Sequence, residues 1–425
     1  MPSLPRDATE TRRFLATKPL TGKRVIVVHP AWHSCGSHQV FVSQMQAYRT
    51  LGANVHSLAI ADFPGWSAGS KAHHAYLAAT QDLIADARHF AGMAWPQMAT
   101  PGFLGALGQW LHGDAAAMLC TTTSNARLPA ELLGLADVDF IHCNHFFCMP
   151  AARALKREYS CPVLLDTHDV QARQFSLRNA KRWRLPPKAS FEDMLARERA
   201  EMQEADLLIH LNDEEAQSWR AFLPDMTHVL IYPAIKPVPT APGGHDIIIV
   251  ASANYPNYLS AKWFLTEVLP LASDIPVRII GNIDQIFRAE APALFAKHAH
   301  LFSGRIDDLE GAYANAGAIL LPTTSGHGIS IKTIEALSSG APLIATREAF
   351  RGIAIDPATL ANVALAKDAE GFAAALRRRT EMPLTPPQAR QTSDTRRLYE
   401  RLFAFDAYAE ALAEQVHTLL SLRKR

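Results

Sequence analysis

A glycine-containing turn that leads into a charged helix carries the clearest chemistry in the sequence. Gly326 and Gly328 follow an apolar run that ends at Leu321, and a helix is predicted to begin at about Ile329. The free N–H groups and the positive dipole end of such a helix favour binding of a phosphate. Lys332 adds a cation in the first turn, where it opposes the dipole and slightly disfavours the helix itself.

A glutamate nearly one turn beyond the lysine completes this pattern. The Glu335 carboxylate can accept hydrogen bonds from two hydroxyl groups of a ribose. The helix is predicted to end at the Gly340-Ala341-Pro342 break, because proline cannot continue a helix, and a second apolar strand follows. The turn, the lysine and the glutamate together predict a site for the two phosphates and the ribose of a nucleoside diphosphate.

The composition indicates a globular chain of two or three domains. The sequence has 425 residues, of which 48% are hydrophobic and 20% charged, so the chain can bury cores and is not disordered. The net charge of +1 gives no reason to expect nucleic acid as a partner. No window approaches the roughly 20 apolar residues of a membrane-spanning helix, and the N-terminal segment lacks the apolar core of a secretory signal.

The cysteines and the C-terminus bear on where the protein works. Five cysteines at irregular spacing predict reduced thiols, and therefore a cytoplasmic protein. The chain ends in three basic residues, Arg423 to Arg425, which could contact an anionic membrane surface. A solvated tail is the more common fate of such a segment. We therefore expect a cytoplasmic protein, with peripheral contact at the inner face of a membrane as an open alternative.

The first half of the chain is predicted to form a parallel α/β sheet. Arg24–His29 is an apolar run of strand length, a helix is expected over Gln39–Leu51, and Asn54–Ile60 forms a second strand. This order predicts a right-handed crossover between parallel strands. Further strands are expected at Asp139–Cys143, Pro162–Thr167 and Leu207–Leu211.

The stretch from about residue 65 to 135 breaks this alternation. It is rich in Ala, His, Met and Trp and is predicted to form helices with loops. An insertion of this size in a sheet domain can serve as a binding or lid element. A helical cap with no role in binding is an equal alternative.

A second sheet is predicted after a linker rich in proline and glycine, Lys236–His245. A helix is expected over Leu259–Ala272, and the tail from Arg396 to Leu420 has the apolar spacing of an amphipathic helix. The alternation of strands and helices predicts a second doubly wound sheet. Its strands are expected at Asp246–Ala251, Val277–Gly281, His298–Phe302, Ala318–Leu321 and Pro342–Ala345.

Two segments of the second half resemble a known family of enzymes. Ile247–Pro270 and Phe302–Thr346 are similar to the first strand–helix unit and the donor motif of retaining GT-B glycosyltransferases of the group 1, or family 4, type. In the first half, Val138–Asn144 and Val163–Asp169 resemble the histidine-bearing strand ends of that family. The resemblance is specific over residues 245–355, looser over 20–60 and 137–232, and absent over 65–135.

The resemblance implies an α/β fold of the GT-B type, in which two Rossmann-like doubly wound domains face each other across a cleft. It implies an N-terminal acceptor domain at residues 20–232, with the insertion at 65–135, and a C-terminal donor domain at 245–390. Residues 391–425 would form a helix that packs back on the N-terminal domain. The implied activity is transfer of a sugar from a nucleotide-diphosphate donor, such as a UDP- or GDP-sugar, to a hydroxyl group of a glycan or lipid acceptor.

The family motif, matched position by position, implies roles for residues of the donor domain. Glu335 matches the glutamate that binds the ribose, and Lys332 matches a basic residue that faces the diphosphate. The donor-binding turn would comprise Ser325, Gly326, Gly328 and Ile329.

The chain departs from the family pattern at two places. The family often has a second glutamate eight positions before the ribose-binding one, in contact with the donor sugar, and this chain has His327 there. The basic pair that follows the first strand of the family's donor domain is replaced by Asn254 and Asn257. We therefore expect Lys332, helix N-termini and Arg305 to neutralise the diphosphate, with Asn254 also in the donor site.

The resemblance also implies how catalysis would proceed. In retaining members of the family the leaving phosphate is thought to accept the proton of the acceptor hydroxyl, so no carboxylate nucleophile, metal or other cofactor is expected. Stabilisation of the leaving group would come from Lys332 and the N–H groups of the turn. His327 and His168 are the other expected catalytic residues.

The acceptor side is predicted at the strand ends of the first half. Trp32 lies in the loop after the first strand, where its indole could stack on a sugar. Gly36 lies in the same loop and is expected on the donor side, where its backbone N–H could contact a phosphate or sugar. Other polar residues end neighbouring strands and should share one edge of the sheet, which favours a site there. These residues are His142, Asn144, His168 and Asp169.

Three alternatives remain open. The chain could be a nucleotide-sugar-binding protein without transfer activity, because His327 replaces the family glutamate. It could be a sugar-nucleotide epimerase, for which Asp169 is the only candidate carboxylate in the first half. Histidines and cysteines within residues 33–38 and 142–148 are metal-type ligands, but none has the spacing of a known site, so no metal is expected.

Overall fold

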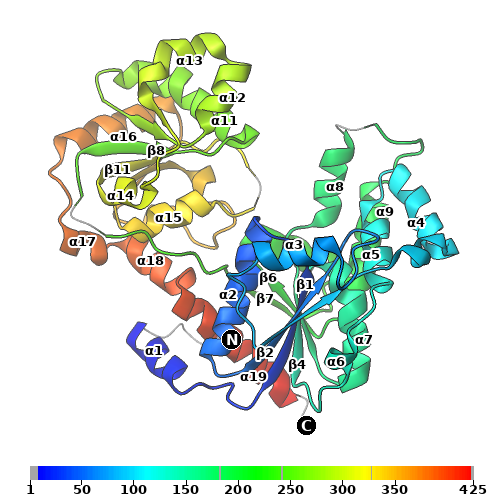
Figure 1. Ribbon diagram of the computed structural model, residues 1–425. Coiled ribbons are helices and arrows are strands. Elements are labelled where there is room, and N and C mark those ends of the chain that lie inside the picture. Colours follow the sequence, from blue (N-terminus) through cyan, green and yellow to red (C-terminus); the bar gives the residue numbers. More distant parts are fainter. Residues whose placement is uncertain (1–7, 181–182, 241–242, 327, 423–425) are drawn as a thin grey trace. The chain divides into compact units, whose positions relative to one another are not determined.

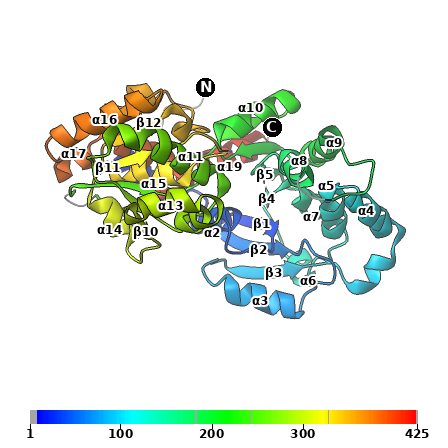
Figure 2. The same ribbon diagram turned by 90° about the horizontal axis from the view of Figure 1, so that it is seen from above.

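The chain folds into two compact units, shown from two directions in Figure 1 and Figure 2. The computed structural model describes residues 8–180, 183–240, 243–326 and 328–422. Unit 1 comprises the chain up to Ala234 together with the segment from Phe405 onward, and unit 2 comprises Ile235–Ala404. Each unit contains one parallel sheet between helices, which confirms the predicted α/β class.

The sheet of unit 1 has seven described strands in the order β3-β2-β1-β4-β5-β6-β7, and every neighbouring pair is parallel. The order changes direction at β1, as in a doubly wound fold, so the loops after β1 and β4 diverge at the carboxyl edge of the sheet. The strands are β1 (Arg24–Pro30), β2 (Asn54–Ile60), β3 (Ala87–Ala91), β4 (Phe140–Asn144), β5 (Val163–Asp166), β6 (Leu207–His210) and β7 (His228–Leu230).

Helices lie on both faces of this sheet (Figure 1). They are α1 (Ala8–Ala16), α2 (Gly36–Thr50), α3 (Lys71–Ala79), α4 (Pro101–Leu111), α5 (Ala115–Ser124), α6 (Ala130–Leu133), α7 (Met149–Tyr159), α8 (Gln171–Ala180), α9 (Phe191–Met202), α10 (Asp213–Phe222) and α19 (Phe405–Leu422), with the 3-10 turns η1 (Trp95–Ala99) and η2 (Phe146–Cys148).

Alternate side chains of β1 enter two different cores. Ile26 and Val28 join an apolar cluster with residues of α5, α7 and α9 on one face of the sheet. Val25 and Val27 join another cluster on the opposite face, with residues of α2 and α19. A central parallel strand that is apolar throughout is buried on both faces, and the polar loops at its carboxyl end are therefore held on a rigid base.

The sheet of unit 2 has six described strands in the order β10-β9-β8-β11-β12-β13, again all parallel. The strands are β8 (Asp246–Val250), β9 (Arg278–Ile280), β10 (Phe302–Gly304), β11 (Ala316–Leu321), β12 (Leu343–Thr346) and β13 (Val363–Ala366). The helices are α11 (Tyr255–Trp263), α12 (Ile283–Glu290), α13 (Pro292–His298), α14 (Leu309–Ala314), α15 (Ile331–Ser339), α16 (Ala369–Glu381), α17 (Pro387–Gln391) and α18 (Asp394–Leu402), with short helical turns η3 (Phe264–Val268), η4 (Leu269–Ala272), η5 (Ala299–Leu301), η6 (Arg347–Phe350) and η7 (Pro357–Thr359).

Several element boundaries differ from the prediction. β3 lies within the stretch at 65–135 that was expected to be helical, and β7 and β13 are short strands that the sequence did not indicate. The run His298–Phe302 is not a strand, because residues up to Leu301 form a helical turn and β10 begins at Phe302. A short apolar run does not by itself distinguish a strand from a buried helical turn.

The C-terminal tail also differs from the prediction. The single helix expected over Arg396–Leu420 is divided into α18 and α19, and the break at Phe403-Ala404 is where the chain leaves unit 2 and enters unit 1. Apolar side chains of α19 such as Tyr408 and Leu412 belong to the core of unit 1. No helix within the described residues is long and apolar enough to cross a membrane.

Candidate functional site

The backbone between β11 and the predicted donor turn is held by two hydrogen bonds. Thr346 Oγ1, at the end of β12, donates a hydrogen bond to the carbonyl oxygen of Thr323 at 2.5 Å. The Thr324 N–H donates to Ser260 Oγ of α11 at 3.1 Å. Helix α15 follows the turn and begins at Ile331, two residues later than predicted, because Ser330 caps it.

The turn itself contains positions where a side chain other than hydrogen would not fit or would be strained. A Cβ at Gly326 would lie 2.4 Å from Nη2 of Arg351, so the backbone and the guanidinium are in close contact. Gly328 has a φ of +64°, in the left-handed region that favours glycine. Ser325 Oγ is buried and has no hydrogen-bond partner among the described residues. A buried hydroxyl without a partner suits a site that a ligand completes.

Glu335 lies in α15 and its carboxylate is held from one side. The Tyr313 hydroxyl, which is buried in α14, donates to Glu335 Oε2 at 2.9 Å. Burial raises the pKa of the Glu335 carboxyl, while the Tyr313 hydrogen bond and the charge of Lys332 lower it. Glu335 also lines a cavity of about 500 Å³, whose other residues include Lys236, Val238, Asp307 and Glu310.

Lys332 lies one turn before Glu335 and is half-buried. Burial lowers the pKa of Lys332 to about 8, with a further lowering from Arg351 and an opposite effect from Glu335. The ammonium group therefore changes its protonation state near neutral pH. A diphosphate placed beside it would favour the charged form.

The other predicted donor residues lie at the carboxyl edge of the same parallel sheet. Asn254 follows β8, Arg305 follows β10, and Ser325 follows β11. Asn254 also has a structural role, because its side-chain oxygen caps α11 by accepting from the Asn257 N–H at 2.9 Å. Arg305 is exposed and forms no ion pair with any described residue. Ile329 is partly exposed, and His327 lies outside the described residues.

The structure adds Tyr313 and Arg351 to this site. Neither residue belongs to the turn or to α15, so no local pattern marks them as functional. The only signal for Tyr313 is that it lies within the segment that resembles the family donor motif. Arg351 follows η6 and reaches the site only because the sheet brings β12 beside β11.

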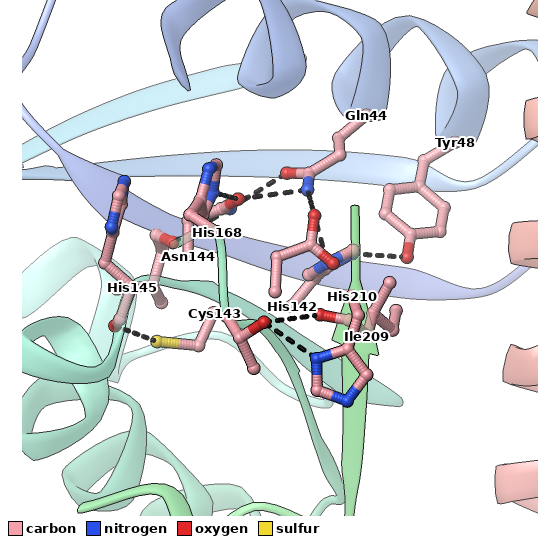
Figure 3. A network of polar contacts seen from close by, with 12 residues as sticks. Gln44, Tyr48, His142, Cys143, Asn144, His145, His168, Ile209 and His210 are labelled. Atoms are coloured by element: carbon pink, nitrogen blue, oxygen red, sulfur yellow. Dashed lines mark hydrogen bonds and ion pairs between the residues drawn. The ribbon is translucent and has the colours of Figure 1, made fainter. Parts of the chain in front are cut away.

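In unit 1 a network of buried polar side chains joins α2 to β4 (Figure 3). Gln44 Nε2 donates to Asn144 Oδ1 at 3.0 Å and Asn144 Nδ2 donates to Gln44 Oε1 at 2.8 Å. Gln44 Nε2 also donates to Asp166. The ring of His142 hydrogen-bonds to the Tyr48 hydroxyl at 2.7 Å and lies 3.3 Å from the Asp166 carboxylate.

This network shows that His142 and Asn144 are in the interior, not at a surface open to an acceptor as expected. Both side chains are fully buried. The residues are two positions apart on β4, so both point to the same face of the sheet, which α2 covers. Their polar groups are satisfied by neighbouring side chains and stabilise the packing of α2 on the sheet.

The ring of His168 packs against the ring of another histidine. Its ring stacks on that of His145 with centroids 3.9 Å apart and an angle of 7° between the planes. His168 Nε2 hydrogen-bonds with Asn144 Oδ1 at 3.0 Å. Burial lowers the pKa of His168 to about 4 and that of His145 well below its usual value, so both imidazoles are neutral at pH 7. Only His145 of this pair lines the cavity described next.

A cavity of about 1030 Å³ lies within unit 1, beside the loops after β1, β4 and β5. Trp32, a predicted acceptor-side residue, lines it, and its indole N–H donates to Asp62 Oδ2 at 2.7 Å. Gly36, a predicted donor-side residue at the start of α2, does not line it, although its neighbours Cys35 and Ser37 do. His145 was a better candidate than His168, and the signal available in the sequence was its position directly after β4.

Asp169 opens onto the same cavity from the loop before α8. Burial raises the pKa of the Asp169 carboxyl and the charge of Arg178 lowers it. Its carboxylate accepts no hydrogen bond from a described residue. Asp169 and Trp32 are therefore the two predicted acceptor-side residues that line this cavity.

Two buried glutamates hold the first turn of α8 next to Asp169. Glu198 accepts from the N–H groups of Gln171 and Ala172, each at 3.0 Å. Glu215 accepts from the Val170 N–H at 2.8 Å. Burial raises the pKa of Glu198 to about 8 and that of Glu215 to about 7. These side chains satisfy helix N–H groups and fix the position of the Asp169 loop.

The metal-type ligands noted in the sequence do not converge. Within the described part of the chain, no group of three or more histidine, cysteine, aspartate and glutamate side chains is arranged to hold a metal ion. Cys143 and Cys148 are buried, and burial raises the pKa of both thiols well above the usual value.

Comparison with known proteins gives a family match within the second unit and a fold match over nearly the whole chain. The family model "Glycosyl transferases group 1" matches residues 244–381. No curated protein sequence matches the chain.

Solved structures match nearly the whole chain at low sequence identity. Sucrose-phosphate synthase from Thermosynechococcus elongatus has a TM-score of 0.57 at 14% identity, covering 94% of this chain and 100% of its own. Anabaena HepE in complex with UDP and glucose has a TM-score of 0.55 at 13% identity, covering 93% and 99%. The α,α-trehalose 6-phosphate synthase of Burkholderia multivorans has a TM-score of 0.59 at 14% identity, covering 95% and 99%.

These matches agree with the two parallel sheets described above. Each sheet is doubly wound, with its strand order reversing at the first strand of the unit. Residues 244–381 therefore match the model of the group 1 glycosyl transferases, and the chain has the GT-B fold of two Rossmann-like domains.

Proposed function

We propose that this protein is a retaining glycosyltransferase that moves a sugar from a nucleoside diphosphate to a hydroxyl group of a glycan or lipid acceptor. One observation carries the proposal: at the carboxyl edge of the unit 2 sheet, the half-buried Lys332 and Glu335 lie on one helix directly after the glycine turn. Glu335 is oriented by Tyr313 and opens onto a cavity. The HepE complex shows that this fold accommodates UDP and glucose in at least one protein.

The residues of unit 2 match the charge changes of such a reaction. The bond between the anomeric carbon and the diphosphate breaks, so negative charge develops on the leaving phosphate while a bond to the acceptor oxygen forms. Lys332 and the N–H groups of the turn would stabilise that charge, with Arg305 at the same sheet edge. The proton of the acceptor hydroxyl would pass to the leaving phosphate, so this proposal requires no metal and no protein nucleophile.

Replacement of Glu335 tests the proposed donor-binding site. Glu335→Ala should weaken binding of UDP or GDP by about 1–3 kcal/mol, because the ribose hydroxyl groups and the Tyr313 hydroxyl lose their acceptor. Isothermal titration calorimetry on the full chain measures this. Glu267→Ala, which removes an exposed glutamate of the same unit, is the matched control and should leave the affinity unchanged. Equal affinities of the wild-type protein and the Glu335 variant would contradict the assignment.

A nucleotide-sugar-binding protein without transfer activity is the second candidate, because His327 stands where the family has a glutamate. A panel of UDP- and GDP-sugars, assayed for both binding and release of the nucleoside diphosphate, separates the two. Binding without release or transfer, across donors and acceptors, would favour this second function. An α-linked product from an α-linked donor, seen by NMR, would support retention.

We also propose that the protein works in the cytoplasm and contacts an anionic membrane surface peripherally. All five cysteines are free thiols, which fits a reducing compartment. Between Val170 and Phe191 the sequence has six basic residues and no acidic one. Trp183 in this segment is 77% exposed, and the Arg184 guanidinium lies 5.5 Å from the centre of the Trp110 ring. The basic tail at Arg423–Arg425 lies outside the described residues.

A further inference from the structure

The lining of the large cavity of unit 1 combines two kinds of side chain. Its polar part, called the polar end, comprises Ser37 at the start of α2 and His145 and Asp169 in the loops after β4 and β5. Its apolar part, called the apolar end, comes from the segment at 63–66 and from η1, α4 and α5. Helices α4 and α5 lie on one side of the sheet (Figure 2). The apolar wall at that end includes Phe63, Trp66, Met98, Phe103, Leu107 and Met118.

Two aromatic side chains of the apolar wall are exposed to solvent. Phe63 is 57% and Trp66 40% exposed to solvent. Apolar surface that faces water in this way is unfavourable in proportion to its area, and such patches commonly mark binding sites. The volume of about 1030 Å³ lies at the upper end of the roughly 300–1,000 Å³ of pockets that take drug-sized ligands. A single sugar would fill little of it and would leave the aromatic wall in water.

The polar end is suited to hydroxyl groups. His145 Nε2 hydrogen-bonds with Ser37 Oγ at 3.2 Å, and His145 Nδ1 is buried without a partner among the described residues. The Asp169 carboxylate faces the cavity without a hydrogen bond from a described residue. An imidazole and a serine hydroxyl can each donate to or accept from hydroxyl groups, and a carboxylate accepts from them.

We infer that this cavity binds the acceptor, and that the acceptor is an amphiphile. Its hydroxylated head lies by His145 and Asp169, and its apolar body, an alkyl chain or an aromatic ring, lies against Trp66 and Leu107. The inference rests on the proposed transferase function, because it names the second substrate of that reaction. The stretch at 65–135, which supplies much of the apolar wall, is then a binding element and not merely a cap.

Helix α4 offers a matched pair of variants for the test. It has no charged side chain over Pro101–Leu111. Leu107 lines the cavity, whereas Leu104, almost one turn earlier, is 56% exposed and does not line it. The same substitution at the two positions therefore changes the cavity in one case and only the surface in the other.

The probes are n-octyl β-D-glucoside below its micelle concentration, phenyl β-D-glucoside and D-glucose. Binding to the full chain is measured by tryptophan fluorescence, since Trp32, Trp66 and Trp110 line the cavity, and is confirmed by calorimetry. At least one of the two glycosides should bind at least tenfold more tightly than D-glucose. Leu107→Gln should weaken that binding at least fivefold and Leu104→Gln less than twofold. If Leu107→Gln does not fold, Trp66→Ala takes its place.

The outcomes separate the sources of the acceptor. Preference for the octyl glucoside supports a lipid-linked acceptor, and preference for the phenyl glucoside supports a soluble aromatic one. Equal binding of all three probes, or equal effects of the Leu104 and Leu107 variants, overturns the inference. UDP binding is measured on the same preparations: if it is absent while the glycoside still binds at the cavity, the transferase proposal fails and the cavity assignment stands.

Discussion

Single side chains set the chemistry of both candidate sites. In unit 2 the Tyr313 hydroxyl occupies one oxygen of Glu335, and the other oxygen accepts no hydrogen bond from a described residue. The carboxylate is therefore oriented before a ligand arrives, which lowers the entropy cost of binding. In unit 1 the stacked rings of His145 and His168 are both neutral, so neither can act as a cation toward a substrate near pH 7.

Lys332 makes nucleotide affinity dependent on pH. Its pKa of about 8 means that the side chain is mostly charged at pH 7 and mostly neutral at pH 9. If the ammonium binds the diphosphate, the dissociation constant for UDP should rise about tenfold between pH 7 and pH 9, because one pKa unit above the midpoint only about a tenth of the free protein is charged. Calorimetry across this range measures the change.

Lys332→Arg is the matched control for this pH effect. Arginine stays charged across the range, so the variant should bind UDP with little change between pH 7 and pH 9. The same tenfold loss in the variant would show that another group titrates, and would remove Lys332 from the diphosphate site.

At the scale of elements, connections between strands and helices form the surfaces that meet ligands. The connection between α8 and α9 is anchored to the end of α4: the Leu185 N–H donates to the Leu111 carbonyl at 3.0 Å and the Ala189 N–H donates to that of His112 at 2.8 Å. The Arg184 guanidinium accordingly lies over the ring of Trp110 in α4, and its chain neighbour Trp183 is exposed. An aromatic side chain among cations is the combination that favours an anionic membrane surface.

The connection between α8 and α9 should contribute to binding of anionic membranes. In co-sedimentation with vesicles, the wild-type protein should bind phosphatidylglycerol-containing vesicles and not pure phosphatidylcholine, because each basic residue near an anionic surface contributes about 1 kcal/mol. Trp183→Ala combined with Arg184→Ala should reduce the bound fraction several-fold. Arg377→Ala combined with Leu271→Ala, at exposed positions of unit 2, is the control and should bind like wild type. Equal binding to both lipids would contradict a membrane role for this surface.

Elements with strong local signals could be predicted, and those that depend on distant contacts could not. Asn54–Ile60 matches β2 in full, because it is a long apolar strand bounded by a glycine turn. The end of α15 was predicted from the Gly340-Ala341-Pro342 break, and Gly340 there adopts a left-handed conformation, with φ of +67°, that glycine favours. β7 and β13 have only three and four residues and are strands because a neighbouring strand pairs with them.

Site residues within one local motif could likewise be predicted, and those that only the fold brings together could not. Lys332 and Glu335 come from one local motif, and their place at the sheet edge follows from the strand before them. The roles of His142 and Asn144 were wrong because a strand end in the sequence does not reveal which face a helix covers. The aromatic cavity was not predicted because Trp32, Phe103 and Phe175 are far apart in the chain and meet only in the folded unit.

At the scale of the whole molecule, the last helix belongs to the unit where the chain began. Tyr408, Leu412 and Val416 of α19 are buried in the core that also contains Val25 and Val27 of β1. Glu410 of α19 accepts a hydrogen bond from the Thr11 hydroxyl of α1 at 2.6 Å. The stability of unit 1 therefore depends on residues that follow the whole of unit 2.

Truncation of one α19 side chain tests this dependence. Leu412→Ala should lower the stability of unit 1 by about 2–5 kcal/mol, because the side chain is buried and its loss leaves a cavity. Differential scanning calorimetry should show a lower transition temperature for one unit, with UDP affinity unchanged at 25 °C. Thr418→Ala, at an exposed position of the same helix, should leave the transition in place. Loss of UDP binding by the Leu412 variant would show that the two units do not fold independently.

The path of the chain determines how one unit of this protein can be exchanged for that of another. Residues 235–404 form one uninterrupted stretch, and its two ends touch: the Ile235 N–H donates to the Phe403 carbonyl at 3.0 Å, and the Tyr399 hydroxyl donates to the Ile235 carbonyl at 2.5 Å. Unit 2 is thus one continuous segment inserted into the sequence of unit 1. Chimeras that exchange residues 235–404 at these paired ends would keep unit 1, including α19, whole.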